Sequence, residues 1–368
     1  MVKSFALMLA ITVALAMIIT GCTPAQESVV PTGQEAAPTA EAAAPTEEHA
    51  AATEPTELKI AIVTDTSLEE PWNTALLAAL ERVIAERPHG LTVSYDIAEN
   101  VADPDAARVL RQFLSTGEYG VVIAHAPFVD AVTELRQEYP DVAWLGVGAG
   151  WPQGEGNLYF VDIAAYEPAY LTGIIAGMMT KSHVIGAVVG FAYPAPNSAV
   201  NAFFDGARSV NPETEGRVTY IDSWWDPAKA REAAAAQIAA GADFIYAERF
   251  GPFEAAAEAG DVYAFGHIFD QHELSPDVVI SSAVVDFDPY VTYIVDLWWD
   301  HVVNGASYNA PAAPVIFYMA DGGSHLAPFY VFDEILPADV KSKVDEVKQS
   351  ILDGSFKVPF NPNQAVSD

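Results

Sequence analysis

The chain is poor in cysteine and in positive charge. Its 368 residues include one cysteine, Cys22, so no disulfide can form within the chain and any thiol chemistry would depend on that residue. Lys and Arg number 17 against 50 Asp and Glu, which gives a formal net charge of −33. Nucleic acids and anionic lipid surfaces bind basic proteins, so we predict neither as a partner of the folded body. We interpret the acidity as an aid to solubility or to life in a saline habitat.

The sequence also lacks the residue spacings of a metal site or a hydrolase. Its 8 histidines form no HExxH motif and no comparable ligand pattern, so we predict no bound metal. A hydrolase would need a metal cluster or a nucleophile activated by a base, and neither pattern is present. We therefore predict no catalytic residue and no cofactor.

A long apolar run occurs at the start of the chain, where Phe5 to Ile19 follows a single charge, Lys3. A short basic start, an apolar core and small residues before a boundary are typical of a secretory signal peptide, which we predict over residues 1–21. The sequence Ile19-Thr20-Gly21-Cys22 resembles the lipobox of bacterial lipoproteins. That resemblance implies that Cys22 is lipidated and anchors the protein to the cell membrane, facing the extracytoplasmic side. An uncleaved transmembrane anchor is the alternative, but the run is near the lower length limit for spanning a bilayer.

Residues 22–56 consist mainly of Ala, Pro, Glu and Thr. This composition offers too little apolar surface to offset the entropy lost on ordering, so we predict a disordered lipoprotein linker.

From residue 57 onwards, short apolar runs alternate with helical patterns. Leu58–Thr64 and Tyr119–Ile123, for example, have the composition of buried strands. This alternation predicts an α/β fold with parallel, doubly wound sheets. Ligands of such sheets bind at the carboxyl ends of the strands. Asp65, His125 and Phe128 follow two of these strands and are therefore candidate binding residues.

The central stretch, Tyr166–Pro212, reads as helix, strand, helix. Gly173 and Gly177 recur at helical spacing, so the first helix has one very small face. Phe191–Asn197 is a proline-containing loop at the carboxyl end of the strand and is another candidate binding loop. We predict that the second helix begins at Ala199.

The segment AYLTGIIAGMMTKSHVIGAVVG, followed by AFFDGARSVNP, resembles the central signature of the BMP (basic membrane protein, or Med-type) family of bacterial ABC-transporter solute-binding lipoproteins. Further matches follow in order and include WWDP at 224–227, GAD at 241–243, YAFG at 263–266 and ILDGSF at 351–356. The resemblance implies a periplasmic-binding-protein type I fold. In that fold two Rossmann-like lobes with parallel sheets are joined by three crossing segments, and the ligand binds between the lobes.

The same resemblance divides the chain into lobes. Lobe 1 would comprise residues 57–165 and 288–318, and lobe 2 would comprise 166–287 and 319–368, which includes the C-terminal segment. We expect the lobes to close about hinges in the three crossings, which are predicted near Ala164–Pro168, Val285–Pro289 and Ile316–Asp321.

Characterised BMP-family proteins include receptors for purine nucleosides and related heterocycles. The resemblance therefore implies a non-catalytic receptor that binds a purine-type nucleobase, nucleoside or similar small heterocycle and delivers it to ABC permease and ATPase subunits. A sensor that feeds a membrane signalling receptor is an alternative that the sequence leaves open. A nucleoside hydrolase is a third alternative, but the missing catalytic patterns speak against it.

The resemblance also suggests roles for individual residues. Trp72 would stack on the base and Asn73 would hydrogen-bond to it, both from a loop that precedes a helix starting at Thr74. In lobe 2 the corresponding aromatic residue is Trp224, which we favour over its neighbour Trp225. The full predicted ligand-binding set is Asp65, Trp72, Asn73, His125, Phe128, Phe191, Trp224, Asp270 and Phe287.

One loop departs from the family pattern. Nucleoside-binding members typically carry Gly-Val-Asp there, with a carboxylate for the ribose hydroxyls, whereas this chain has Gly266-His267-Ile268. The loop instead resembles a subgroup with Gly-x-x-x-Asp-Met, here with Gln271 in the last place. The missing carboxylate favours a free nucleobase or another small heterocycle as the ligand.

Overall fold

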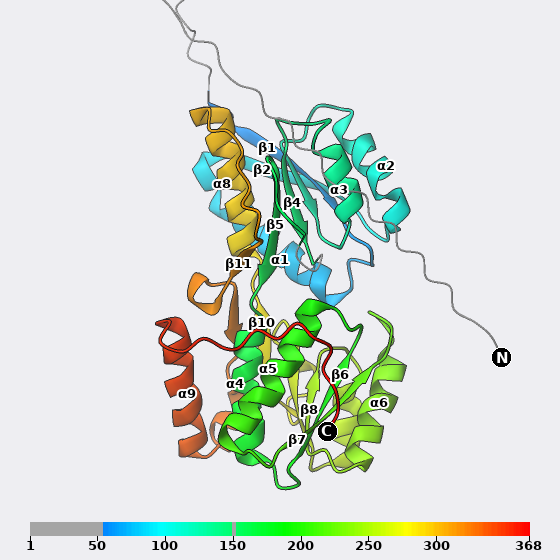
Figure 1. The fold of residues 1–368 in the computed structure, drawn as a ribbon, viewed down its shortest axis with the longest axis vertical. Helices are drawn as coiled ribbons and strands as arrows, with labels where there is room; N and C mark the ends of the chain where they lie inside the picture. Colours follow the sequence, from blue (N-terminus) through cyan, green and yellow to red (C-terminus); the bar gives the residue numbers. More distant parts are fainter. Residues whose placement is uncertain (1–53, 149–151) are drawn as a thin grey trace, which may run out of the picture. The chain divides into compact units, whose positions relative to one another are not determined.

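The computed structural model describes residues 54–148 and 152–368. The predicted signal peptide (1–21), Cys22 and the predicted linker as far as residue 53 lie outside the described residues. The folded body has two lobes, each built on its own six-stranded sheet (Figure 1). None of the helices in the described ranges is long and apolar enough to cross a membrane.

Lobe 1 is a parallel sheet between two helical layers, with the strand order β11-β5-β4-β3-β1-β2. Helices α1 and α8 pack together on one face, and α2 and α3 pack on the other (Figure 1). The bounds of the strands are β1 Glu57–Val63, β2 Thr92–Ala98, β3 Val121–Ala124, β4 Ala143–Val147, β5 Leu158–Ile163 and β11 Val315–Phe317. Those of the helices are α1 Pro71–Glu86, α2 Asp103–Leu114, α3 Val129–Leu135 and α8 Asp288–Asn304.

Lobe 2 repeats this plan with the strand order β12-β10-β9-β8-β6-β7, in which β12 alone among the described strands runs antiparallel to its neighbour. Its strands are β6 Val184–Val189, β7 Glu215–Tyr220, β8 Phe244–Ala247, β9 Tyr263–Ile268, β10 Val279–Val285 and β12 Ser324–Leu326. Its helices are α4 Tyr166–Met179, α5 Pro194–Val210, α6 Pro227–Ala239, α7 Pro252–Ala259 and α9 Ala338–Leu352. The two sheets confirm the predicted α/β class, and each places the carboxyl ends of its parallel strands along one edge.

Helices α4 and α5 pack with their backbones in close contact. A Cβ atom added at Gly173 would lie 2.0 Å from the carbonyl oxygen of Phe203, and one added at Gly177 would lie 2.4 Å from that of Ala207. From the other helix, a Cβ atom at Gly206 would lie 2.1 Å from the carbonyl oxygen of Tyr170. The small face predicted from the sequence is therefore the surface on which α5 packs, and no side chain fits at these glycines without moving the helices apart.

The chain passes between the two sheets three times, and the passing segments are hydrogen-bonded to one another. The backbone N–H of Ala164 donates to Phe317 at 2.9 Å, and that of Asp286 donates to Gly323 at 2.7 Å. The hydroxyl of Ser324 donates to the carbonyl of Ala164 at 3.0 Å. The three connections therefore form one bonded bundle between the lobes.

Two helices begin earlier than the sequence predicted. Helix α1 starts at Pro71 rather than Thr74, because the Glu70 side chain caps it by accepting from the backbone N–H of Trp72 at 2.8 Å. Helix α5 starts at Pro194 rather than Ala199. Proline in the first helical turn forfeits no hydrogen bond, and its fixed φ suits the helix, so these prolines belong to the helices that follow them. The predicted loop positions of Trp72 and Asn73 were therefore wrong.

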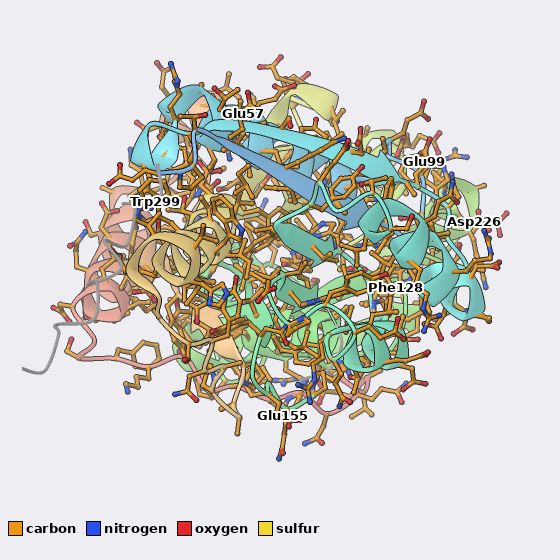
Figure 2. All side chains as sticks on the ribbon, turned by 90° about the horizontal axis from the view of Figure 1, so that it is seen from above. Glu57, Glu99, Phe128, Glu155, Asp226 and Trp299 are labelled. Carbon is orange, nitrogen blue, oxygen red and sulfur yellow. The ribbon has the colours of Figure 1, made fainter. Side chains whose placement is uncertain are left out.

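The acidic side chains are concentrated on the outside of the lobes. Glu57, Glu99 and Glu155 are exposed, and Glu155 lies at the lower margin of the molecule in the view of Figure 2. Their carboxylates remain hydrated there.

Candidate functional site

A cavity of about 120 Å³ lies between the two lobes at the carboxyl ends of their strands. Lobe 1 contributes Asp65, Trp72 and His125 to its lining, and lobe 2 contributes Trp224, Arg249 and His267. Four of the nine predicted binding residues thus meet at one cavity, namely Asp65, Trp72, His125 and Trp224. Asp65 and His125 were predicted from their places after strands, whereas Trp72 and Trp224 were predicted from the family resemblance.

The other five predicted residues do not line this cavity. Asn73 is buried, and its amide donates to the hydroxyl of Thr66 and to the carbonyl of Ser67, both at 2.9 Å. Asn73 therefore holds the loop that carries Asp65. The Asp270 carboxylate accepts from the backbone N–H of His272 at 3.2 Å and from the hydroxyl of Tyr330. Both polar side chains are thus engaged within the protein.

The three phenylalanines of the predicted set pack behind the cavity or away from it. Phe128 is buried in the core that α2 and α3 form with the sheet of lobe 1. Phe287 is fully buried, with its ring edge-on to Trp72 at a centroid distance of 4.7 Å. Phe191 packs edge-on against Trp224 at 4.8 Å. Two of the three therefore support the tryptophans that line the cavity.

Trp72 lies in the first turn of α1 and packs on a ring from another strand end. Its indole stacks on His125 with a centroid distance of 5.0 Å and an interplanar angle of 16°. The side chain is half-buried rather than solvent-facing. The earlier start of α1 explains this, since a helical residue is fixed against the core whereas a loop residue would be free to turn outwards.

His125 is a structural ring with both nitrogens in use. Its Nε2 lies 3.1 Å from the carbonyl oxygen of Trp72, which can only accept, so Nε2 carries the proton. The hydroxyl of Tyr290, 2.9 Å away, then donates to Nδ1. Complete burial lowers the pKa of His125 to about 3, so the ring is neutral at physiological pH.

Trp224 forms the wall on the lobe 2 side. The guanidinium carbon of Arg249 lies 5.1 Å from the centroid of its ring, a cation–π contact. A Cβ atom at Gly190 would lie 2.8 Å from the ring, so glycine is needed at the end of β6 for the indole to fit. Trp225, by contrast, is 52% exposed, packs on Phe250 and does not line the cavity.

Three buried charges meet at the cavity, and the sequence analysis identified none of them. Arg249 donates to Glu248 through Nε and Nη2, at 2.8 and 2.6 Å, and to Glu70 through Nη1 at 3.0 Å. Glu70 belongs to lobe 1 and Arg249 to lobe 2, so this ion pair bridges the lobes. Burial raises the pKa of Glu70, and the charge of Arg249 partly offsets that effect. One signal was available, because Glu248 and Arg249 directly follow the short apolar run Phe244–Ala247, which forms β8, in a chain with few cations.

Arg249 is also connected to both tryptophans of the cavity, Trp224 and Trp72. Its Nη1 also donates to the backbone carbonyl of Trp224 at 3.0 Å, while its ion-pair partner Glu70 caps the helix at Trp72. A change at Arg249 would therefore reach both faces of the cavity.

Asp65 and His267 complete the polar lining. Asp65 is solvent-accessible at the cavity, yet the surrounding protein atoms raise its pKa through desolvation. No Lys or Arg of the described residues forms an ion pair with it. His267 is buried, and its Nδ1 lies 2.7 Å from the hydroxyl of Tyr246. Throughout 54–148 and 152–368, no group of three His, Cys, Asp or Glu side chains is arranged to hold a metal ion.

The chain is similar in sequence and in fold to known ABC transporter substrate-binding proteins. A family model described as ABC transporter substrate-binding protein, PnrA-like, matches residues 58–306. A Brucella abortus protein named purine-binding protein is 27% identical over 278 residues, which cover 74% of each chain. A Haloferax volcanii protein, named for a proposed role as an ABC transporter glucose-binding protein, is 32% identical over 198 residues, 53% of this chain and 50% of that protein. The crystal structure of a solute-binding protein of an ABC transporter system from Aeropyrum pernix K1 has the same fold, with a TM-score of 0.66 and 19% identity, over 83% of this chain and 94% of the other.

Proposed function

Because the chain belongs to the family of PnrA-like ABC transporter substrate-binding proteins, we propose that it is a lipid-anchored, extracytoplasmic receptor of an ABC importer for a purine-type nucleobase, nucleoside or related heterocycle. Membership confirms the resemblance to the BMP family that the sequence motifs carried. The family is one of solute-binding proteins rather than of enzymes. The observation that carries the ligand assignment is the presence of two tryptophans, one from each lobe, at a single cavity.

Indole faces are suited to planar ligands. Stacking a base on an aromatic side chain contributes about 1–3 kcal/mol and depends little on which base is bound. Trp72 from lobe 1 and Trp224 from lobe 2 both line the cavity, so a flat ring bound there can contact both lobes. A ligand that contacts both lobes binds the closed form more tightly than the open form, and therefore stabilises the closed form.

The charges at the cavity favour a neutral or cationic ligand. Asp65, Glu70, Asp162 and Glu248 contribute four carboxylates to the lining, against the single guanidinium of Arg249. An anion such as a nucleotide would bring further negative charge into this partly desolvated space, at a large cost. A nucleobase or nucleoside is neutral and presents N–H groups that carboxylates accept. The name of the Brucella relative is consistent with this ligand class.

The proposed anchor and transporter follow from the N-terminal motif and the family. Cys22 is the only thiol of the chain and ends a lipobox-like sequence. A lipid on that residue would tether the receptor through the linker, within reach of ABC permease and ATPase subunits. This arrangement places the ligand-binding body outside the cytoplasm.

The direct test is to identify the ligand. We expect mass spectrometry of the purified, denatured protein to release a purine-type heterocycle. Isothermal titration of ligand-stripped protein with adenine, guanine, hypoxanthine and their nucleosides should then give saturable binding. Absence of binding to every heterocycle would overturn the ligand assignment, while leaving family membership intact.

A hexose is the second candidate. The Haloferax relative shares 32% identity and carries the glucose-related name, although only half of each chain is covered. Carboxylates accept hydrogen bonds from sugar hydroxyls as readily as from N–H groups, so the acceptor-rich lining is also compatible with a sugar. The titration therefore includes glucose, and tight binding of glucose without heterocycle binding would favour this candidate.

A further inference from the structure

Each lobe holds one buried histidine at the cavity, and each histidine is bonded to a buried tyrosine hydroxyl. In lobe 1, Tyr290 meets Nδ1 of His125 at 2.9 Å. In lobe 2, Tyr246 meets Nδ1 of His267 at 2.7 Å. Both tyrosines are fully buried, and both histidines line the cavity. The two pairs therefore start from the same local chemistry.

The two histidines differ in the hydrogen bonding of the second ring nitrogen, Nε2. Nε2 of His125 is used inside the protein, because it donates to the carbonyl oxygen of Trp72. Nε2 of His267 has no hydrogen-bond partner among the described residues, although the side chain is only 5% exposed. Since His267 lines the cavity, that nitrogen is available to a molecule bound there.

The hydrogen-bond network fixes which nitrogen of His267 carries the proton. The hydroxyl of Tyr246 is buried and has His267 as its hydrogen-bond partner, so its proton must go to Nδ1 or remain unsatisfied. An unsatisfied buried donor is costly. We therefore assign Nδ1 as the acceptor and Nε2 as the protonated nitrogen. Burial and the nearby charge of Arg249 lower the pKa of His267 to about 3, so the ring is a neutral, single donor.

The other polar side chains at the cavity offer no further free donor from Arg249 and offer an acceptor at Asp65. Asp65 presents a carboxylate that accepts, and Arg249 is occupied by Glu248, Glu70 and the carbonyl of Trp224. A ligand that satisfies both lobes must offer an N–H group to Asp65 and an acceptor to His267. Heterocyclic bases with adjacent ring nitrogens, carbonyls and amino groups have both on one flat ring.

We propose that His267 is a specificity-determining residue whose Nε2–H donates to a ring nitrogen or carbonyl oxygen of the bound heterocycle. This inference rests on the proposed function and refines it. The ligand class becomes planar nitrogen heterocycles with an unprotonated acceptor on the edge that faces lobe 2. His267 then selects by hydrogen bonding, whereas His125 supports Trp72 and makes no polar contact with the ligand.

The test pairs changes in the protein with changes in the ligand. Calorimetry measures the affinity of wild type and His267→Leu for adenine, for hypoxanthine and for their deaza analogues, each of which replaces one ring nitrogen by C–H. We expect His267→Leu to weaken binding of the intact base by roughly tenfold, because the acceptor on the ligand loses its donor. The one analogue that lacks this acceptor should bind wild type and variant equally. For hypoxanthine, whose carbonyl can be the acceptor, unsubstituted purine serves as the corresponding analogue.

Two further variants separate recognition from folding. His267→Gln keeps an N–H donor near Nε2 and should restore most of the affinity. The double variant Tyr246→Phe/His267→Leu removes the orphaned hydroxyl, so it should regain the thermal stability that His267→Leu loses but not the affinity. If affinity returned together with stability, His267 would be a packing residue and the proposal would fall.

The outcomes distinguish this proposal from the proposed function. If no heterocycle binds the wild-type protein, both are wrong. If a base binds wild type but His267→Leu binds it as tightly, the proposed function stands and only the role of His267 is wrong. If every deaza analogue and unsubstituted purine show the same loss in the variant as the intact bases, no ligand acceptor is paired with His267, and the proposal is again overturned.

Discussion

Glu70 and Arg249, 179 positions apart in the chain and in different lobes, form an ion pair of 3.0 Å that is almost completely buried. Removing two charges from water is costly unless both are paired and hydrogen-bonded. Here Glu248 and the carbonyl of Trp224 complete the bonding of the guanidinium, so the pair is well satisfied. The contact exists only while the lobes are together, which makes it a stabiliser of the closed form.

We predict that Glu70→Gln shifts the ligand-free protein towards an open form. Glutamine can still cap α1 at Trp72, but it removes the charge that Arg249 contacts across the cavity, while Arg249 stays paired with Glu248 within lobe 2. Small-angle scattering of the ligand-free variant should give a larger radius of gyration than wild type, with recompaction on saturation. The control is Glu69→Gln, which changes an exposed carboxylate of the same loop. Equal radii for Glu70→Gln and wild type would contradict the interlobe role.

We predict that Trp224→Ala weakens heterocycle binding by about ten- to a hundredfold, the equivalent of losing a stacking contact of about 1–3 kcal/mol. The matched control is Trp225→Ala, because this neighbouring indole is exposed and does not line the cavity. Calorimetric titration of both variants checks the prediction. A larger loss from Trp225→Ala than from Trp224→Ala would reverse the assignment of the two residues.

Trp72→Ala should lower both affinity and stability. Loss of the indole removes a wall of the cavity, and it also leaves His125 and Phe287 without their stacking and edge-on partner. We expect an affinity loss of about ten- to a hundredfold and a destabilisation of about 2–4 kcal/mol, as for truncation of other half-buried or buried aromatic side chains. Thermal melts of the ligand-free protein measured beside the titration separate the two effects. An unchanged melting temperature would mean that the packing on His125 contributes little.

The two buried histidines should make stability fall as the pH falls. Their folded-state pKa of about 3 lies below the ordinary value of 6.5, so between these values the unfolded chain binds more protons than the folded one. Their contribution is complete above about pH 6.5 and is lost on acidification, at up to about 1.4 kcal/mol per pH unit for each histidine. Urea unfolding at about pH 7.5 and about pH 5.5 should therefore show a smaller pH-dependent loss for His267→Gln than for wild type. Identical losses would mean that the pKa of His267 is the same in the folded and the unfolded chain.

Membrane attachment should depend on Cys22. Cys22→Ser removes the thiol that the predicted lipid would modify, so we expect the protein in the soluble fraction or as an uncleaved precursor. Cell fractionation with immunoblotting and mass measurement of the N-terminus distinguish these forms. A Cys22→Ser protein that is processed and still sediments with membranes would rule out the lipid anchor.

Local sequence patterns predicted the α/β alternation and some of the residues that line the cavity. Asp65, His125 and Trp224 follow recognisable strands, and the edge of a parallel sheet brings such residues together whatever lies between them in the chain. The backbone at a strand end does not reveal which way a side chain points, and for this reason Phe128 and Phe287 were expected at the cavity but are buried in the core. Pro71 and Pro194 were read as loop residues, although proline also fits the first turn of a helix.

The buried ion pair at the cavity could not be predicted from local sequence patterns. The pairing of Glu70 with Arg249 depends on how two lobes meet, and neither periodicity nor spacing encodes contacts between positions so far apart. His267 was noticed only as a missing carboxylate. Its role as a donor depends on Tyr246, whose hydroxyl reaches it from the neighbouring strand.

The glycines at which α4 packs on α5 identify the family of this chain, whereas other residues, those that line the cavity, determine which ligand it selects. Gly173, Gly177 and Gly206 lie in the motif by which the family is identified, yet they serve a backbone contact in lobe 2 and do not line the cavity. The contact between the two helices requires small residues at these positions and does not depend on the ligand, so we expect relatives with different cargo to share it. Receptors with the same cargo as this one are better sought by comparing positions 65, 72, 224, 249 and 267 than by overall identity.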